Sequence, residues 1–101
     1  MVRACMRPAY AGPVFTLGQV VITPGAVELG YKTETDILLL LARHSMGDWG
    51  TIDVLDRQVN ESALKSGSRL MSEYIIGNDQ RIWIITDADR SVTTILIPSE
   101  Y

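Results

Sequence analysis

Residues 69–98, with the sequence RLMSEYIIGNDQRIWIITDADRSVTTILIP, decide the fold of this chain. They contain three runs rich in β-branched and aromatic residues, at 69–76, 81–87 and 92–98, which have the composition of strands. The polar connections around residues 77–79 and 88–91 are short enough to join only antiparallel neighbours. The stretch therefore predicts a three-stranded antiparallel meander. Residues 82–85, Ile-Trp-Ile-Ile, are apolar on both faces, so Trp83 is expected on the central strand.

The segment before the meander has the 3.6-residue period of a helix. Residues 54–66 are predicted to form a helix that begins after the N-cap Asp53 and stops at Gly67. Its core-facing positions are expected to be the apolar ones, Leu55, Val59, Ala63 and Leu64. Its other face is expected to be solvated, and carries pairs four residues apart among Asp56, Arg57, Asn60, Glu61 and Lys65.

A further helix is predicted between a cap at Thr33, with Asp36 three residues on, and a stop at Gly47. The residues expected to face the core are Ile37, Leu38, Leu40 and Leu41. Residues 17–23 include a β-branched run and predict a strand. Thr23 and Pro24 then predict the start of a short helical turn that stops at Gly30.

These elements predict one α+β domain over residues 14–101. It has an N-terminal strand and two to three short helices packed on the C-terminal antiparallel β-meander. One face of the sheet is expected to be covered by helices, and the other needs a further cover or a partner. Residues 1–13 show no periodicity and are predicted to be a loosely ordered arm.

Composition limits the classes of function. The net charge of -3, from 9 basic and 12 acidic residues, does not favour general nucleic-acid binding, which needs a basic excess. One cysteine, Cys5, and one histidine cannot build a structural zinc site, and a single cysteine fits a reducing compartment. We therefore expect a cytoplasmic protein without a metal or cofactor. The longest apolar run, residues 37–42, is far shorter than the ~20 residues of a membrane span. So small a core would gain from a protein partner or from homodimerisation.

Two groups of residues are candidates for chemistry. His44 lies at a predicted helix end with Asp48 four residues on, where the acid could orient a general base. The alternative is that His44 interacts with the carbonyls at the helix end and Trp49 fills the core. Trp49 lies on a turn between two glycines, so it is also a candidate binding residue if the turn exposes it.

The second group lies on the last predicted connection. Asp89 and Arg90 are followed by Thr93 and Thr94, and an arginine beside hydroxyls could hold a phosphate or stabilise negative charge. Asp89 and Arg90 are also candidates for contact with a protein. The alternative is a turn held by hydrogen bonds of the aspartate side chain, with the threonines selected by β-propensity.

Four stretches of the sequence indicate the genetic setting of the chain. The stretches LGQVVITPGAVE, ARHSMGDWG, NESALKSGSRLMSEY and RIWIITDADRSVTTILIPSEY, within residues 17–101, resemble a family of short plasmid-related proteins of plasmids, prophages and other mobile elements. No activity accompanies that resemblance. It implies an accessory protein of a mobile element.

Two functions of different classes follow. The first, which we favour, is a small protein-binding module that acts on a host or on a defence or regulatory complex. The second is a small metal-independent ribonuclease, similar to barnase and RelE-type toxins, that would use His44, Arg90 and Thr93 or Thr94. Convergence of these residues and Asp48 in one cleft would favour the enzyme, and scattering would favour the binding module.

Overall fold

The computed structural model describes residues 12–101, so most of the predicted arm at 1–13 lies outside the described part of the chain. The elements follow one another as β1 (Gln19–Ile22), α1 (Pro24–Lys32), α2 (Ile37–Ser45), α3 (Val54–Ser66), β2 (Leu70–Ile76), β3 (Gln80–Thr86), β4 (Val92–Leu96) and the 3₁₀ turn η2 (Pro98–Glu100). The predicted α+β class is confirmed.

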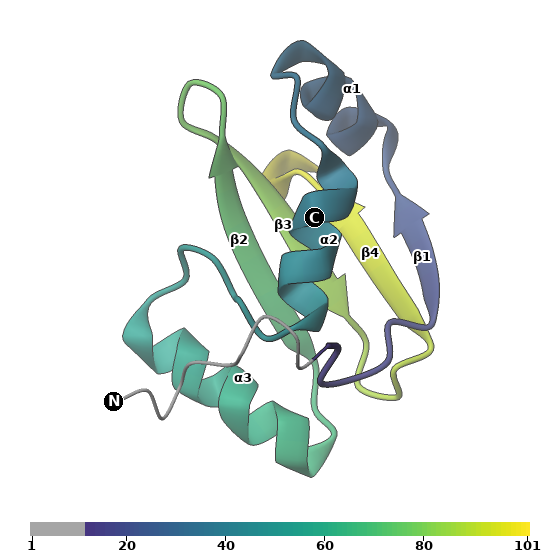
Figure 1. Ribbon diagram of the computed structural model, residues 1–101, viewed down its shortest axis with the longest axis vertical. Coiled ribbons are helices and arrows are strands. Elements are labelled where there is room, and N and C mark those ends of the chain that lie inside the picture. Colours follow the sequence, from purple (N-terminus) through teal and green to yellow (C-terminus); the bar gives the residue numbers. More distant parts are fainter. Residues whose placement is uncertain (1–11) are drawn as a thin grey trace.

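The four strands form one sheet with the order β1-β4-β3-β2 (Figure 1). Strands β2, β3 and β4 are an antiparallel meander, as predicted, and Trp83 lies on β3 between Glu73 and Leu96. Strand β1 pairs in parallel with β4, with Gln19 opposite Val92, so the first strand joins the last. The sequence did not predict this pairing.

The main core lies between α2 and one face of the sheet. Helix α2 crosses this face in Figure 1, with α1 beyond the end of β1. Leu40 of α2 belongs to the same buried cluster as Ile82, Ile84 and Ile95 of the sheet. On the other face, Trp83 packs edge-on against Tyr101, with ring centroids 5.6 Å apart. The segment after β4 therefore covers part of that second face.

Several helix ends match their predicted caps. Thr23 accepts a hydrogen bond from the amide of Ala26, Asp53 caps α3, and Gly67 ends α3 in the left-handed region. Two predictions were wrong. Helix α1 continues past Gly30 to Lys32, and Gly30 serves close packing instead of termination, since a Cβ atom there would lie 2.9 Å from Ile37. The N-cap of α2 is Asp36, whose side chain accepts from the amide of Leu38.

The predicted core faces of two helices also need correction. Leu38 of α2 is 65% exposed. On α3, Leu55 and Val59 are 70% and 61% exposed, whereas Asn60, assigned to the solvated face, is buried. The physical reason is that α3 lies beside β2 with Asn60 bonded to Met71 and Ala63 packed against Trp49 and Leu70, so that Leu55 and Val59 on the opposite side face solvent. No helix in the described part of the chain is long and apolar enough to cross a membrane.

Candidate functional site

His44 is part of a buried polar chain that connects α2 to three strands. Its Nδ1 atom lies 2.6 Å from the hydroxyl oxygen of Ser72, and its Nε2 atom lies 2.9 Å from that of Thr86. The Thr86 hydroxyl lies 2.7 Å from the hydroxyl of Thr93, which donates to the carbonyl oxygen of Leu17. These side chains satisfy one another inside the core. One interpretation of the sequence was that His44 interacts with the carbonyls at the end of α2. The structure shows instead that both ring nitrogens contact hydroxyl groups of the sheet.

Burial makes His44 a poor general base at neutral pH for any solute. Its exposed fraction is 0%, and burial, helped by the positive charge of Arg90, lowers its pKa to about 4. A substrate would have to open the core to reach either ring nitrogen.

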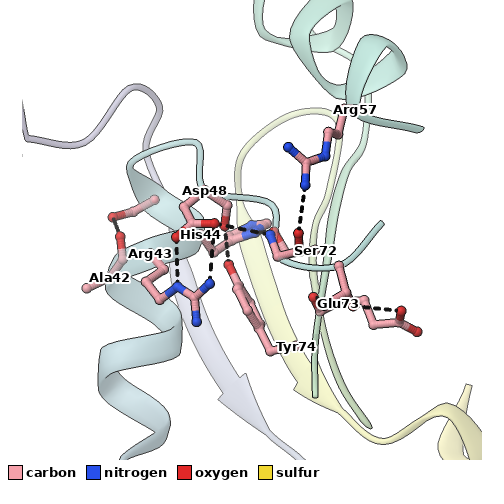
Figure 2. A network of polar contacts seen from close by, with 11 residues as sticks. Ala42, Arg43, His44, Asp48, Arg57, Ser72, Glu73 and Tyr74 are labelled. Atoms are coloured by element: carbon pink, nitrogen blue, oxygen red, sulfur yellow. Dashed lines mark hydrogen bonds and ion pairs between the residues drawn. The ribbon is translucent and has the colours of Figure 1, made fainter. Parts of the chain in front are cut away.

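Asp48 does not orient His44. Figure 2 shows Asp48 beside Arg43, whose Nε atom lies 2.7 Å from an Asp48 carboxylate oxygen. The amide of Gly50 also donates to this carboxylate, and the hydroxyl of Tyr74 donates to the Asp48 carbonyl oxygen. Partial burial acts to raise the pKa of Asp48, but the hydrogen bonds from Arg43 and Gly50 and the charges of Arg43 and Arg57 hold it below its usual value. The predicted pairing of His44 with Asp48 is wrong.

Arg90 fastens the β3–β4 turn to the end of α3. Its guanidinium donates to the carbonyl oxygens of Ser68 and Ala63, at 2.6 and 3.0 Å, and lies 5.7 Å from the centroid of the Phe15 ring. It also donates to the turn carbonyls of Asp87 and Ala88. Since both terminal nitrogens of its guanidinium bond to carbonyls within the chain, Arg90 has a structural role in this conformation, unlike the free phosphate-binding or partner-binding arginine we considered.

The rest of the turn fits the simpler interpretation. The Asp89 carboxylate accepts from the amide and the hydroxyl of Ser91, at 3.0 and 2.6 Å. Asp89 is exposed and remains a candidate contact residue. Thr93 is buried, while Thr94 is one residue further along β4 and thus points to the opposite face of the sheet. His44 and Thr93 are therefore linked through Thr86, but Asp48 and Thr94 lie elsewhere.

Trp49 fills a second, smaller core. It is 4% exposed and packs with Ala63 and Leu70. Its indole nitrogen donates to the Glu61 carboxylate at 2.9 Å. The two glycines around this turn do not expose the ring, so Trp49 cannot contact a partner in this conformation.

The structure reveals a surface that the sequence did not predict. Helix α3 presents an uncharged strip to solvent, which we call the outer face of α3 and which consists of Leu55, Gln58, Val59, Ser62 and Ser66. A shallow groove of about 390 Å³ follows it, bounded by these residues with Ala63 and Ser68. Val54, at the start of the helix, is 67% exposed as well. The sequence signal was the helical spacing of Leu55 and Val59, which we had assigned to the core.

The comparisons with known proteins add no further assignment. No family model, curated protein or solved structure matches the chain. Among residues 12–101, no three histidine, cysteine, aspartate or glutamate side chains gather where they could hold a metal ion. The arguments for function therefore rest on the geometry of the chain itself.

Proposed function

We propose that this chain is a small protein-binding module whose partner docks on the outer face of α3. The observation that carries this proposal is the exposure of Leu55 and Val59, at 70% and 61%, on a helix that buries the polar residue Asn60. Apolar side chains gathered on one exposed helix face are typical of interaction sites. The resemblance to plasmid-related proteins supports a partner in a host or in a defence or regulatory complex.

The lining of the groove indicates the chemistry of the partner. It contains leucine, valine, alanine, serine and glutamine but no charged side chain. A charged ligand group would lose its hydration there without gaining an opposite charge. The small serine side chains at positions 62 and 66 would let another backbone approach α3 closely. We therefore propose an apolar, uncharged helix or loop ridge of a partner protein as the occupant.

The ribonuclease hypothesis gains no support from the geometry. Its general base would be buried, its arginine is bonded to backbone carbonyls, and Thr94 lies on the other face of the sheet from His44. A metal-independent ribonuclease needs an accessible base near a cation at the reacting phosphate. We therefore keep the binding module as the proposed function.

Site-specific photocrosslinking in host cells tests the proposal. A benzophenone amino acid at Val59 should capture one partner protein, and the same group at Leu39 of α2, an equally exposed apolar position, is the matched control. The partner is then purified, and its affinity is measured for the wild type and for Leu55→Glu and Leu39→Glu.

The expected result is a loss of at least about tenfold in affinity for Leu55→Glu, since interface hot spots contribute 2 kcal/mol or more, with little change for Leu39→Glu. A thermal melt of both variants checks that the fold is intact. Equal capture at positions 59 and 39, or equal affinities of the two variants, would contradict docking on α3.

A further inference from the structure

The two edges of the sheet differ in how their backbone groups are bonded. The outer edge of β2 is covered from within the chain at Met71 and Glu73. The side chain of Asn60 donates to the carbonyl oxygen of Met71 at 2.7 Å and accepts from its amide at 3.3 Å. Two residues further, the amide of Glu73 donates to the carbonyl of Trp49, and the amide of Thr51 donates to the carbonyl of Glu73.

Gly50 makes this second cover possible. It bridges to Glu73 with a positive φ of 78°, and a Cβ atom at this position would lie 1.9 Å from the Glu73 carbonyl oxygen. The close approach therefore requires glycine. The chain thus covers two successive outward-facing residues of β2, one with a side chain and one with a backbone bridge.

The outer edge of β1 has no such cover among residues 12–101. The amides of Gln19 and Thr23 donate to the carbonyls of Ser91 and Ile95 on the β4 side. In a parallel ladder, alternate residues bond to the same neighbour, so the amides and carbonyls of Val20 and Ile22 point away from β4. Strand β1 is the last strand of the sheet on this side, as Figure 1 shows.

Strand β1 is short, with four residues, but its sequence carries none of the side chains that keep an edge strand from pairing. Natural edges carry charged side chains, proline or bulges that discourage a second strand. Residues 14–27 contain no charged side chain, and the strand itself reads Gln-Val-Val-Ile without proline. Val20, Val21 and Ile22 are each 37–40% exposed. This edge is therefore competent to add a strand.

We infer that the outer edge of β1 pairs antiparallel with β1 of a second copy of this chain, about a two-fold axis at Val21. Val20 then lies opposite the partner subunit's Ile22, and Ile22 opposite the partner subunit's Val20. Each pair exchanges two backbone hydrogen bonds, because both residues direct their amide and carbonyl outward. The two sheets become one continuous sheet of eight strands.

Charge and shape favour a second copy as the occupant. An uncharged β-branched strand does not repel its own symmetric mate and offers no charge that would select an acidic or basic peptide. Ile22 also forms one wall of a largely apolar groove of about 580 Å³, together with Val27, Tyr31 and Ile37. Symmetric pairing sets the partner subunit's Val20 beside Ile22, at the mouth of this groove.

Amide exchange read residue by residue provides the test. At low protein concentration the amides of Gln19 and Val21, which bond to β4, should exchange slowly, and those of Val20 and Ile22 should exchange fast. At high concentration, Val20 and Ile22 should become protected as the mass rises from the 11.2 kDa of one chain toward twice that value.

Two variants connect this protection to the edge. Val20→Pro removes an outward amide without removing a bond to β4, and Val20→Lys adds charge to the edge. Each should weaken dimerisation at least about tenfold, because a lost hydrogen bond leaves its buried partner group unsatisfied or a charge must be desolvated. Leu39→Lys, the same change at an exposed position of α2, should leave the dimer unchanged, and melting curves verify the folds.

Three outcomes would overturn the inference. One is a mass of 11.2 kDa up to about 1 mM, beyond which association is too weak to matter. Another is a dimer that Leu55→Glu disrupts while Val20 and Ile22 still exchange fast, which would assign self-association to α3. The third is that these amides are protected at every concentration and lose this protection when residues 1–11 are removed. That result would mean that the chain's own N-terminal residues pair with this edge.

Discussion

The Nδ1 atom of His44 lies 2.6 Å from the hydroxyl oxygen of Ser72, and both residues are fully buried. The other ring nitrogen contacts Thr86, so the imidazole is held between two hydroxyls rather than by an acid. Such a site stabilises the neutral ring and disfavours the imidazolium.

The free energy of unfolding should therefore depend on pH through His44. The folded chain binds this proton only near pH 4, whereas the unfolded chain binds it near pH 6.5, so the unfolded state holds more protons between these values. The free energy of unfolding should be unaffected by His44 above about pH 6.5 and should fall by up to about 3 kcal/mol as the pH decreases to about 4. Urea denaturation at a series of pH values measures this. A His44→Gln variant with the same slope in this window would show that another group is responsible.

Asn60 should contribute to stability, although the sequence pattern of α3 placed it on the solvated face of the helix. Asn60→Ala leaves the amide and carbonyl of Met71 without their partner, so we expect a loss of about 1–3 kcal/mol in the free energy of unfolding. Ser62→Ala, on the exposed side of the same helix, should change it by less than about 0.5 kcal/mol. Equal unfolding midpoints for the two variants would refute the role of Asn60 at the edge of β2.

Arg90 should likewise prove structural. Arg90→Ala removes the hydrogen bonds to the carbonyls of Ser68 and Ala63 and should cost about 1–3 kcal/mol. Arg90 also has a φ of 61°, which glycine adopts more easily, so Arg90→Gly should be less destabilising than Arg90→Ala by up to about 1 kcal/mol. Thermal melts compare the two variants with Lys32→Ala, which breaks only an exposed ion pair. A melting temperature of Arg90→Ala equal to that of the wild type would contradict the structural role of Arg90.

The neighbouring leucines of α2 provide a test of the core. Leu40 is 6% exposed, and its truncation to alanine should cost about 2–5 kcal/mol, as should Ile84→Ala. Leu39 is 63% exposed, so Leu39→Ala should change the free energy of unfolding by less than about 0.5 kcal/mol. Chemical denaturation measures all three. A larger effect at position 39 than at position 40 would mean that α2 presents a different face to the sheet.

RNA incubated with the purified protein in the presence of a chelator should remain intact. The reason is the burial of His44 beneath its hydroxyl partners, which prevents contact with a phosphodiester. Gel analysis of total RNA gives the answer. Reproducible cleavage that disappears in His44→Ala, with an unchanged melt, would restore the ribonuclease hypothesis and overturn the proposed binding module.

Local signals in the sequence predicted the backbone well. The two short connections of the meander contain residues that adopt positive φ, Gly77 and Asp79 in the first and Arg90 in the second. The caps Thr23 and Asp53 and the stop at Gly67 depend on neighbours three or four residues away, so they could be read directly. The same reasoning failed at Thr33, because Asp36 supplies a cap closer to the helix.

The candidate site could be predicted only in part. His44, Arg90 and Thr93 were recognised as unusual, and all three make specific polar contacts. Their partners Ser72, Thr86 and the carbonyls of Ser68 and Ala63 lie 7 to 42 residues away in the chain. The spacing of residues in a sequence carries no information on such contacts. For these three residues the sequence therefore could not distinguish a catalytic or binding role from a structural one.

The sequence by itself determined the strands of the meander, their antiparallel order and most helix ends, because these depend on interactions between residues close in the chain. The tertiary structure alone decided that β1 joins β4 in parallel, that Asn60 turns inward and that Leu55 and Val59 turn outward. Helical period tells which residues share a face but not which face is buried. On α3 the buried side is the one where Asn60 bonds to the backbone of Met71 and Ala63 packs against Trp49 and Leu70, and these partners lie on other elements of the chain.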